Sequence, residues 1–130
     1  KVYLCDVGFS KIIESNKEIG KKMENIVYLE LIRTKKPNSE IFFWKNTAQE
    51  EVDFVIKKEE KISELVQVCK DVKDLETKKR EIRSLLKASK ELKCNNLTII
   101  TEDYEFEEDV EWFEIKGKII YKPIWKWLLE

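Results

Sequence analysis

One step along the chain limits its fold more than any other: a helix-forming segment lies between two strand-forming segments. Ile62–Cys69 has the mixed polarity of a strand, and Leu75–Lys93 follows it with an apolar stripe at helical spacing. Leu97–Thr101 comes directly after this helix and holds uncharged, mostly β-branched residues, which indicates a strand buried on both faces. Two strands joined through a helix lie parallel, with a right-handed crossover. The sequence therefore predicts an α/β domain.

The segments before this step predict a second helix and a β-hairpin. Lys1–Cys5 is a short β-prone run. Apolar residues then recur every three or four positions and predict a helix over about Asn16–Lys35. Ile41–Trp44 and Val52–Ile56 follow as two strands joined by a polar connection. The predicted order is thus helix, three strands, helix and strand, which gives a mixed sheet with helices packed against it.

The segments after this step predict smaller elements. An acidic loop is expected over Glu102–Asp109, followed by short strands at Val110–Ile115 and Ile119–Tyr121. The glycine-containing run Lys116–Lys118 is predicted to be the turn between these two strands. A short terminal helix is expected over Ile124–Leu129. Positions 1–130 therefore make one domain, without an internal repeat or linker.

The composition limits the class of protein. Lys and Arg number 25 and Asp and Glu 26, which argues against a strongly basic coat for nucleic acid. The three cysteines, Cys5, Cys69 and Cys94, have no CxxC spacing and no histidine accompanies them, so neither a zinc site nor a disulfide framework is predicted. We expect reduced thiols in a cytoplasmic protein. The Lys/Glu-rich composition is typical of hyperthermophiles, and also of lysine-rich mesophiles.

The sequence shows neither a membrane-spanning apolar run nor a signal peptide, so we expect no membrane contact. The chain begins at Lys1 without a methionine. We therefore expect it to be a fragment of a longer polypeptide.

One acidic residue is discordant with the first predicted helix. Glu30 falls near the middle of the apolar cluster on that helix. An acid on an apolar face must be paired, bound to a cation, or turned outward at the rim of a pocket. The alternative is that this end of the helix lifts from the core and Glu30 meets a lysine.

Two polar residues are discordant with the predicted strands. Strict alternation puts Asp53 on one face with Val55, and puts three apolar residues on the other face: Val52, Phe54 and Ile56. Asp is depleted in strands, so its presence indicates a role for that face, unless the face is simply exposed. Gln67 shares a face with Cys69 on the next strand. Its alternative role is that of a hydrogen-bonding residue within the sheet.

Several stretches together resemble a known family. Lys1–Phe9 and Met23–Leu31 are similar to the carboxy-terminal domain of prokaryotic, especially archaeal, AAA+ ATPases. The similarity continues through the remaining stretches: Phe43–Asn46, Glu51–Ile56, Gln67–Cys69, Glu76–Glu81, Leu97–Thr101 and Pro123–Leu129. The resemblance implies a restriction-endonuclease-like mixed sheet flanked by helices. It also implies a preceding ATPase module, which would bind ATP. This sequence itself contains no GxxxxGK motif, so we expect no ATP site within it. The family's domain is usually described as of unknown function.

The resemblance to the PD-(D/E)XK nuclease superfamily also implies a site. Glu30 and Asp53 would hold a divalent metal such as Mg²⁺, with Gln67 beside it, near a phosphate. The pattern requires a lysine two residues after Gln67, where this chain has Cys69. A thiol does not replace an ammonium group that orients water and stabilises developing charge.

Two lysines are candidates to replace the missing one. Lys57 shares the face of Asp53, and Lys45 lies on the neighbouring strand of the hairpin. We therefore include both among the candidate catalytic residues, together with Glu30, Asp53 and Gln67.

A basic stripe runs beside the apolar face of the long helix. It consists of five residues: Lys79, Arg80, Arg83, Lys87 and Lys90. Such a stripe could follow a phosphate backbone. The alternative is a solvated face whose cations pair with Glu76 and Glu91 along the helix.

The sequence leaves three functions open. The first is a nuclease-like accessory domain of an AAA+ ATPase, which binds nucleic acid or a protein partner with little or no cleavage. The second is a metal-dependent DNA endonuclease. The third is a structural module of the ATPase assembly, which could be oligomeric. A fold and a partial motif do not establish chemistry, so the site's geometry must decide.

Overall fold

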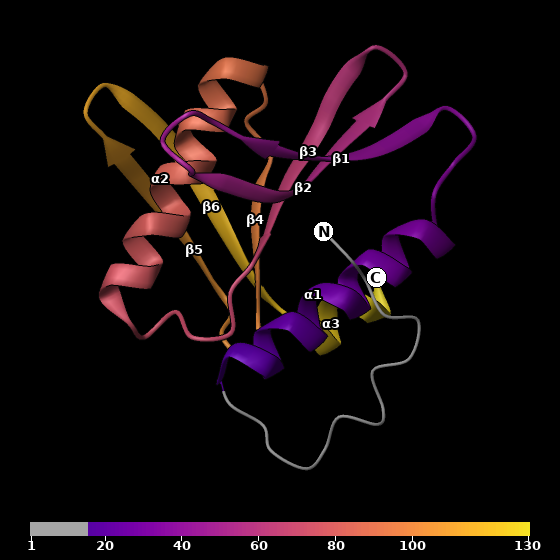
Figure 1. Cartoon of the computed structure of the whole chain (residues 1–130), viewed down its shortest axis with the longest axis horizontal. Helices are drawn as coiled ribbons and strands as arrows, with labels where there is room; N and C mark the ends of the chain where they lie inside the picture. The colour runs from indigo at the N-terminus through magenta and orange to yellow at the C-terminus, as the bar shows by residue number, and fades with distance from the viewer. Residues whose placement is uncertain (1–15) are drawn as a thin grey trace.

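A computed structural model describes residues 16–130, and the strand predicted at Lys1–Cys5 lies outside this range. The elements follow in the order α1 (Asn16–Arg33), β1 (Ser39–Lys45), β2 (Glu51–Lys58), β3 (Lys61–Val68), α2 (Leu75–Leu92), β4 (Leu97–Thr101), β5 (Phe106–Trp112), β6 (Ile115–Pro123) and α3 (Ile124–Leu129) (Figure 1). The helix–strand–strand–strand–helix–strand order expected from the sequence is confirmed.

The six strands form one mixed sheet, in the order β1-β2-β3-β4-β6-β5. The first three strands pair antiparallel, whereas β4 pairs parallel with both β3 and β6. The crossover from β3 through α2 to β4 is therefore the parallel connection that the sequence predicts. Strands β1 and β5 are the two edges of the sheet.

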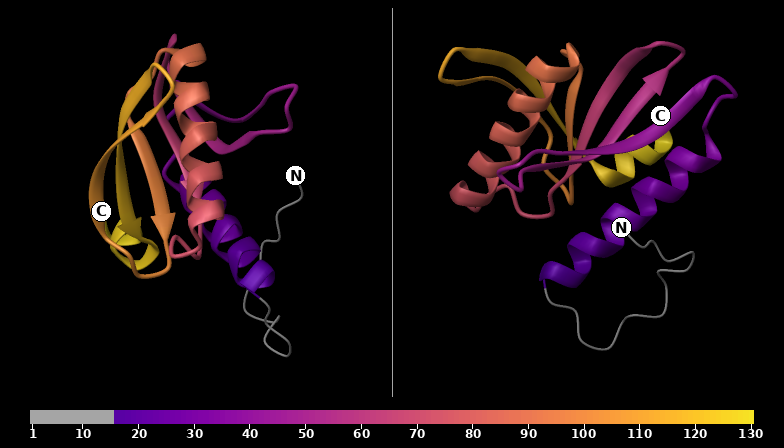
Figure 2. Two further views of the ribbon diagram at one scale, coloured as in Figure 1. Left: turned by 90° about the vertical axis from the view of Figure 1, so that its left-hand side faces the viewer. Right: turned by 45° about the horizontal axis from the view of Figure 1, so that its top comes forward.

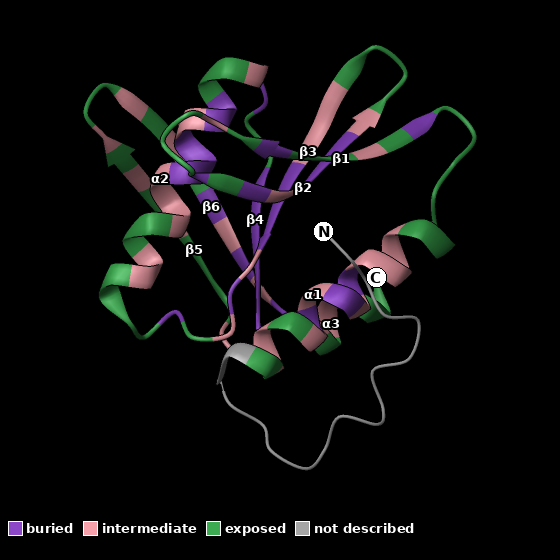
Figure 3. Ribbon diagram, in the orientation of Figure 1, coloured by how far each residue is buried: buried purple, intermediate pink, exposed green. Residues whose placement is uncertain are grey.

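The helices cover the sheet on two sides. Leu85 and Leu86 of α2 pack on one face, in a core cluster that includes Leu65, Ile99 and Ile119. Helix α1 packs on the other face, together with α3, and the right-hand view shows these two helices side by side (Figure 2). The buried residues concentrate in the central strands and on the inner sides of α1 and α2 (Figure 3). No helix within residues 16–130 is long and apolar enough to cross a membrane.

A bulge in β2 corrects one prediction about its faces. Phe42 pairs with Val55, but two residues later Trp44 pairs with Val52, three residues earlier on β2. The additional residue interrupts the alternation, as in any β-bulge. Val52 therefore joins Val55 in the core cluster beneath α2, whereas Phe54 contributes to the opposite face. The prediction that Val52 shares a face with Phe54 is wrong.

The turn between β5 and β6 also differs from the prediction. It lies at Phe113 and Glu114, not at Lys116–Lys118, and the second half of the expected acidic loop, from Phe106 on, is strand. Gly117 lies within β6, at a point where α2 comes very close to the sheet. A Cβ at this position would lie 2.8 Å from Leu86 Cδ2 and 3.1 Å from Leu97 Cδ1. The glycine serves close packing rather than a turn.

Candidate functional site

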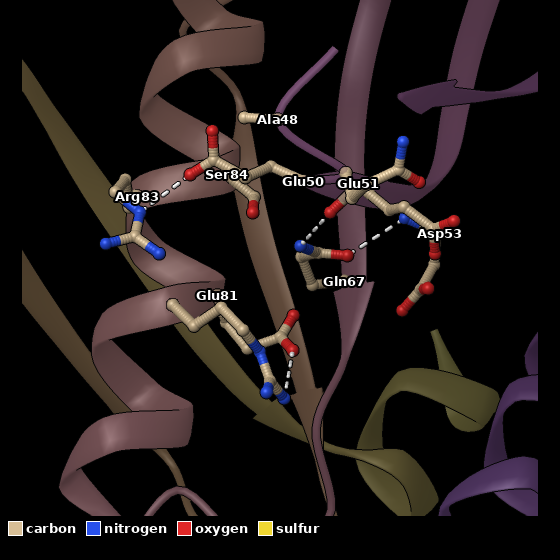
Figure 4. Close-up of a pocket in the computed structure, with 10 residues that line it drawn as sticks. Ala48, Glu50, Glu51, Asp53, Gln67, Glu81, Arg83 and Ser84 are labelled. Atoms are coloured by element: carbon tan, nitrogen blue, oxygen red, sulfur yellow. Dashed lines mark hydrogen bonds and ion pairs between the residues drawn. The ribbon is translucent and has the colours of Figure 1, made fainter. Parts of the chain in front are cut away.

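Helix α2 borders a polar cavity on the side of β2 and β3. The cavity has a volume of about 380 Å³ (Figure 4). Its walls come from the turn before β2, the start of β2, the end of β3 and one side of α2: Ala48, Gln49, Glu50, Glu51, Asp53, Gln67, Arg80, Glu81, Arg83 and Ser84. Two of the residues predicted for a nuclease-like site, Asp53 and Gln67, are therefore brought together here.

The side-chain amide of Gln67 continues the sheet where the backbone pairing stops. Strands β2 and β3 pair as far as Phe54 and Val66, and the next residue on β2 lies at the bulge. There Gln67 Oε1 accepts a hydrogen bond from the Asp53 N–H at 2.9 Å, and Gln67 Nε2 donates to the Glu51 carbonyl at 2.8 Å. One amide thus satisfies a backbone donor and a backbone acceptor, as a peptide group would. Gln67 is 1% exposed.

Asp53 makes the reciprocal contact. Its Oδ2 accepts a hydrogen bond from the Val68 N–H on β3 at 2.9 Å. The two side chains therefore bridge the diverging strands in both directions. A carboxylate oxygen used in this way holds the backbone in place, and Asp53 is a structural hydrogen-bond partner of β3.

Glu30 does not line this cavity. It lies on α1, whose Val27 packs with Phe54 and Ile56 on the opposite face of the sheet. Both of its carboxylate oxygens accept hydrogen bonds from Arg33, at 2.7 and 2.6 Å, and these bonds lower the pKa of Glu30. The cation that this acid meets is an arginine one turn later on its own helix.

Cys69 occupies the place of the expected lysine, and it is buried. Its side chain is 5% exposed and belongs to the core cluster beneath α2. Burial raises the pKa of the Cys69 thiol to about 12, so the thiol is neutral at physiological pH. The neighbouring Lys70 pairs with Glu102 at 3.3 Å. Neither Cys69 nor Lys70, which follow β3, therefore supplies a cation at the position of the expected lysine.

Neither candidate replacement lysine lines the cavity. Lys45 lies at the end of β1, about half-exposed, with its Nζ 3.8 Å from Glu51. Lys57 lies four residues beyond Asp53 on β2, toward the β2–β3 turn.

Glu50 is the residue that the sequence analysis missed. It is only 8% exposed, and Arg83 and Lys87 donate to its two oxygens at 2.6 Å each. Asn46 adds a third hydrogen bond across the turn. Burial opposes ionisation of Glu50, but the three donors outweigh it and lower the pKa to about 2. The i,i+4 spacing of Arg83 and Lys87 was visible in the sequence, but their partner, more than 30 residues earlier, was not.

The basic stripe of α2 is therefore partly neutralised. Arg83 and Lys87 bind Glu50, and the Lys87 ammonium also lies 4.6 Å from the centre of the Trp112 ring. Arg80 lines the cavity beside Glu81, 3.7 Å away. Lys79 and Lys90 are exposed. The five cations thus do not form one uniform surface for phosphate.

The donor set does not fit a divalent metal. Hard cations need several oxygens free to converge on one point. Within residues 16–130 no group of three or more His, Cys, Asp or Glu side chains is placed to hold a metal ion. Gln67 is engaged with the backbone, and Glu30 is engaged with Arg33. The polar side chains around the cavity instead connect β2 with β3 and the turn before β2 with α2.

Comparison with known proteins places the chain in a family without a described function. Residues 19–117 match the model of a domain of unknown function, DUF4143, and the chain belongs to this family. The chain is 37% identical over 131 residues to the uncharacterized protein MJ1544 of the archaeon Methanocaldococcus jannaschii. This match covers 99% of the chain but 29% of the length of that protein.

Proposed function

We propose that this chain is a non-cleaving accessory domain of a larger protein, with a restriction-endonuclease-like sheet that now serves binding. The resemblance to AAA+ ATPase carboxy-terminal domains supports an ATPase as the rest of that protein. This chain matches 29% of the length of its archaeal relative, which is consistent with a segment of a larger protein.

The observation that carries the proposal is the use of Gln67. Its amide makes both of its bonds to the β2 backbone, while Asp53 holds the β3 backbone. Catalysis by a metal site needs ligands that are preorganised around the ion and not engaged elsewhere. The buried thiol of Cys69 stands in place of the lysine that would stabilise developing charge.

The charges favour a protein partner over nucleic acid. Two of the five cations of the α2 stripe are neutralised by the buried Glu50. The segment 102–111 carries seven acids and no base, and it includes most of the edge strand β5. Four of these acids form ion pairs with lysines elsewhere: Glu102 with Lys70, Glu105 with Lys126, Glu107 with Lys118 and Glu108 with Lys78. A duplex presents a phosphate charge about every 1.7 Å along its axis, and the remaining acids of this edge repel it.

The test is a cleavage assay with Asp53→Ala as the matched control. The protein is incubated with Mg²⁺ or Mn²⁺ and with supercoiled DNA, linear duplex, single-stranded DNA and RNA. We expect no metal-dependent product above the level of Asp53→Ala. Metal-dependent cleavage that Asp53→Ala abolishes would refute the proposal.

A second variant tests whether the absence of a lysine at position 69 is the reason that the site does not cleave. Cys69→Lys restores the Gln-x-Lys pattern, but it places an ammonium in a buried position. We expect this variant to lose stability and to remain inactive, because Gln67 Oε1 and Asp53 Oδ2 stay engaged with backbone N–H groups. Metal-dependent nicking by Cys69→Lys that is lost again with Asp53→Ala would show a recoverable nuclease site instead.

A further inference from the structure

Helix α2 borders a second depression on its other side, toward β5. This groove has a volume of about 500 Å³ and runs between the first half of the helix and the edge strand. Its apolar surface comes from Leu75 and Ile82 on the helix and from Val110 and Trp112 on the strand. Leu75, at the mouth of this cleft, is 66% exposed.

Strand β5 is an edge strand along this groove. It pairs antiparallel with β6 and is the last strand in the sheet order. Within residues 16–130, no strand pairs with its outer N–H and C=O groups. An edge strand beside a helix is the arrangement in which extended peptides add to a sheet and place alternate side chains in the groove.

The floor of the groove is fixed by internal contacts. Glu108 accepts a hydrogen bond from the buried Tyr121 hydroxyl at 2.8 Å and pairs with Lys78 at 3.3 Å. The Trp112 and Phe113 rings pack at nearly a right angle, with 4.5 Å between the ring centroids. The remaining lining residues are charged: Lys79 and Arg83 lie on the side of α2, and Asp109 and Glu111 on the side of β5. The apolar surface of the groove thus lies between a basic wall on the helix and an acidic wall on the strand.

The two faces of β5 differ in charge. Glu108, Val110 and Trp112 are half-buried and turn toward α2, while the intervening acids Glu107, Asp109 and Glu111 are exposed. Glu107 pairs with Lys118 of β6 at 3.3 Å. An added strand would place one set of side chains against the apolar groove. Its other set would lie across from Asp109 and Glu111, where opposite charges stabilise a cross-strand pair.

The same acids argue against two other occupants. A second copy paired through β5 would bring acids against acids, which destabilises a strand pair. A nucleic acid would bring phosphates to the same acidic edge. An extended segment matches both faces of β5 if its apolar side chains point toward the groove and its basic side chains lie beside Asp109 and Glu111.

We propose that the groove between α2 and β5 binds an extended segment of a partner protein, in which apolar and basic residues alternate. The segment adds to the sheet as a strand beside β5, with its apolar side chains toward Leu75 and Trp112 and its basic side chains toward Asp109. This inference rests on the proposed function in assuming a protein partner. It does not depend on the cleavage result, because Asp53 and Gln67 do not line the groove.

The probe is a labelled synthetic peptide of about eight residues, the length of an ordinary strand, that alternates Lys and Val. Three comparison peptides isolate its features: one alternates Glu and Val, and two carry backbone N-methyl groups on alternate residues, in the two possible phases. Binding is followed by fluorescence polarisation. We expect the Lys/Val peptide to bind and the Glu/Val peptide to bind at least about tenfold more weakly. Only one N-methyl phase should block binding, because alternate N–H groups of an added strand face the sheet.

Two matched pairs of variants locate the site. Leu75→Ser removes an exposed apolar residue from the groove, and Phe43→Ser removes a 55% exposed one from the other edge of the sheet. Asp109→Lys and Asp103→Lys change the net charge equally, but only Asp109 lies on β5. We expect Leu75→Ser and Asp109→Lys to weaken binding of the Lys/Val peptide about tenfold, and their controls to leave it unchanged.

Four results would overturn the inference: no binding of the Lys/Val peptide, equal binding of the acidic peptide, equal binding of both N-methyl phases, or equal loss in Leu75→Ser and Phe43→Ser. Self-association or nucleic-acid binding that Leu75→Ser abolishes would also overturn it, since the groove would then have another occupant. Cleavage that depends on Asp53, together with groove binding, would refute only the proposed lack of cleavage.

Discussion

The two sides of α2 use their side chains in opposite ways. On the side of β2 and β3, polar groups are buried and engaged by the protein itself: Gln67 holds the β2 backbone, and Glu50 holds two cations of the helix. On the side of β5, apolar side chains such as Leu75 stay exposed beside a strand that forms the edge of the described sheet. The first side has the polar cavity typical of an active site, but its side chains bond to the backbone and to α2 and so stabilise the fold. The second side has surface that folding alone does not require.

The largest effect is expected at Gln67. Gln67→Met keeps the side chain's length but leaves the Asp53 N–H and the Glu51 carbonyl without their partner. We expect a loss of about 2 to 3 kcal/mol in the free energy of unfolding, measured by urea denaturation. Gln49→Met makes the same substitution at an exposed position of the same cavity and should change stability by less than about 0.5 kcal/mol. Equal effects at the two positions would contradict the structural role of Gln67.

Glu50 gives the next largest effect, together with a pH dependence. Its pKa falls from 4.5 to about 2 on folding, so its contribution to stability is full above pH 4.5 and is lost as the pH falls toward 2. Glu50→Gln should cost about 2 kcal/mol at pH 7, because Arg83 and Lys87 lose a buried anion. It should also flatten the decline of stability between pH 4.5 and 2. An unchanged acid profile in Glu50→Gln would contradict this assignment.

Gly117 tests how closely α2 must approach the sheet between the two clefts. Gly117→Ala forces its Cβ against the fully buried Leu86, and we expect a loss of about 1 kcal/mol in thermal or urea unfolding. In the control Gly20→Ala, within α1, the new Cβ meets no atom within 4 Å, and stability should rise by about 0.5 to 1 kcal/mol. A gain in both variants would mean that the helix can shift without cost.

Leu75 should show the smallest effect on stability. Leu75→Ser changes an exposed residue of the groove, so the free energy of unfolding should shift by less than about 0.5 kcal/mol in urea denaturation. A loss of more than about 1 kcal/mol would mean that Leu75 serves the fold, and would remove the contrast between the two sides of α2.

The sequence predicted the elements better than their local geometry. Hydrophobic periodicity located the α2 crossover and the buried strand Leu97–Thr101, because burial imposes that pattern directly. The β2 bulge leaves no such pattern, so alternation placed Val52 on the wrong face. Gly117 looked like a turn residue because the close approach of Leu86 is a tertiary contact.

The candidate site was predictable in part for the same reason. Asp53 and Gln67 were singled out as polar residues on apolar strands, and they do meet. Their partners could not be predicted, because those partners are backbone groups exposed by the bulge. Glu50 was missed because it lies in a polar turn, and only the fold brings Arg83 and Lys87 to it.

The central claim is that Asp53 and Gln67 hold the sheet together and do not hold a metal. The most direct measurement is the melting temperature of the protein and of Asp53→Ala, each with and without 10 mM Mg²⁺ or Mn²⁺. A site with a Kd one hundredth of the metal concentration would stabilise the folded state by about 2.7 kcal/mol, which raises the melting temperature by several degrees. We predict the same small shift in both proteins. A rise of several degrees in the unaltered protein that is absent from Asp53→Ala would contradict the account.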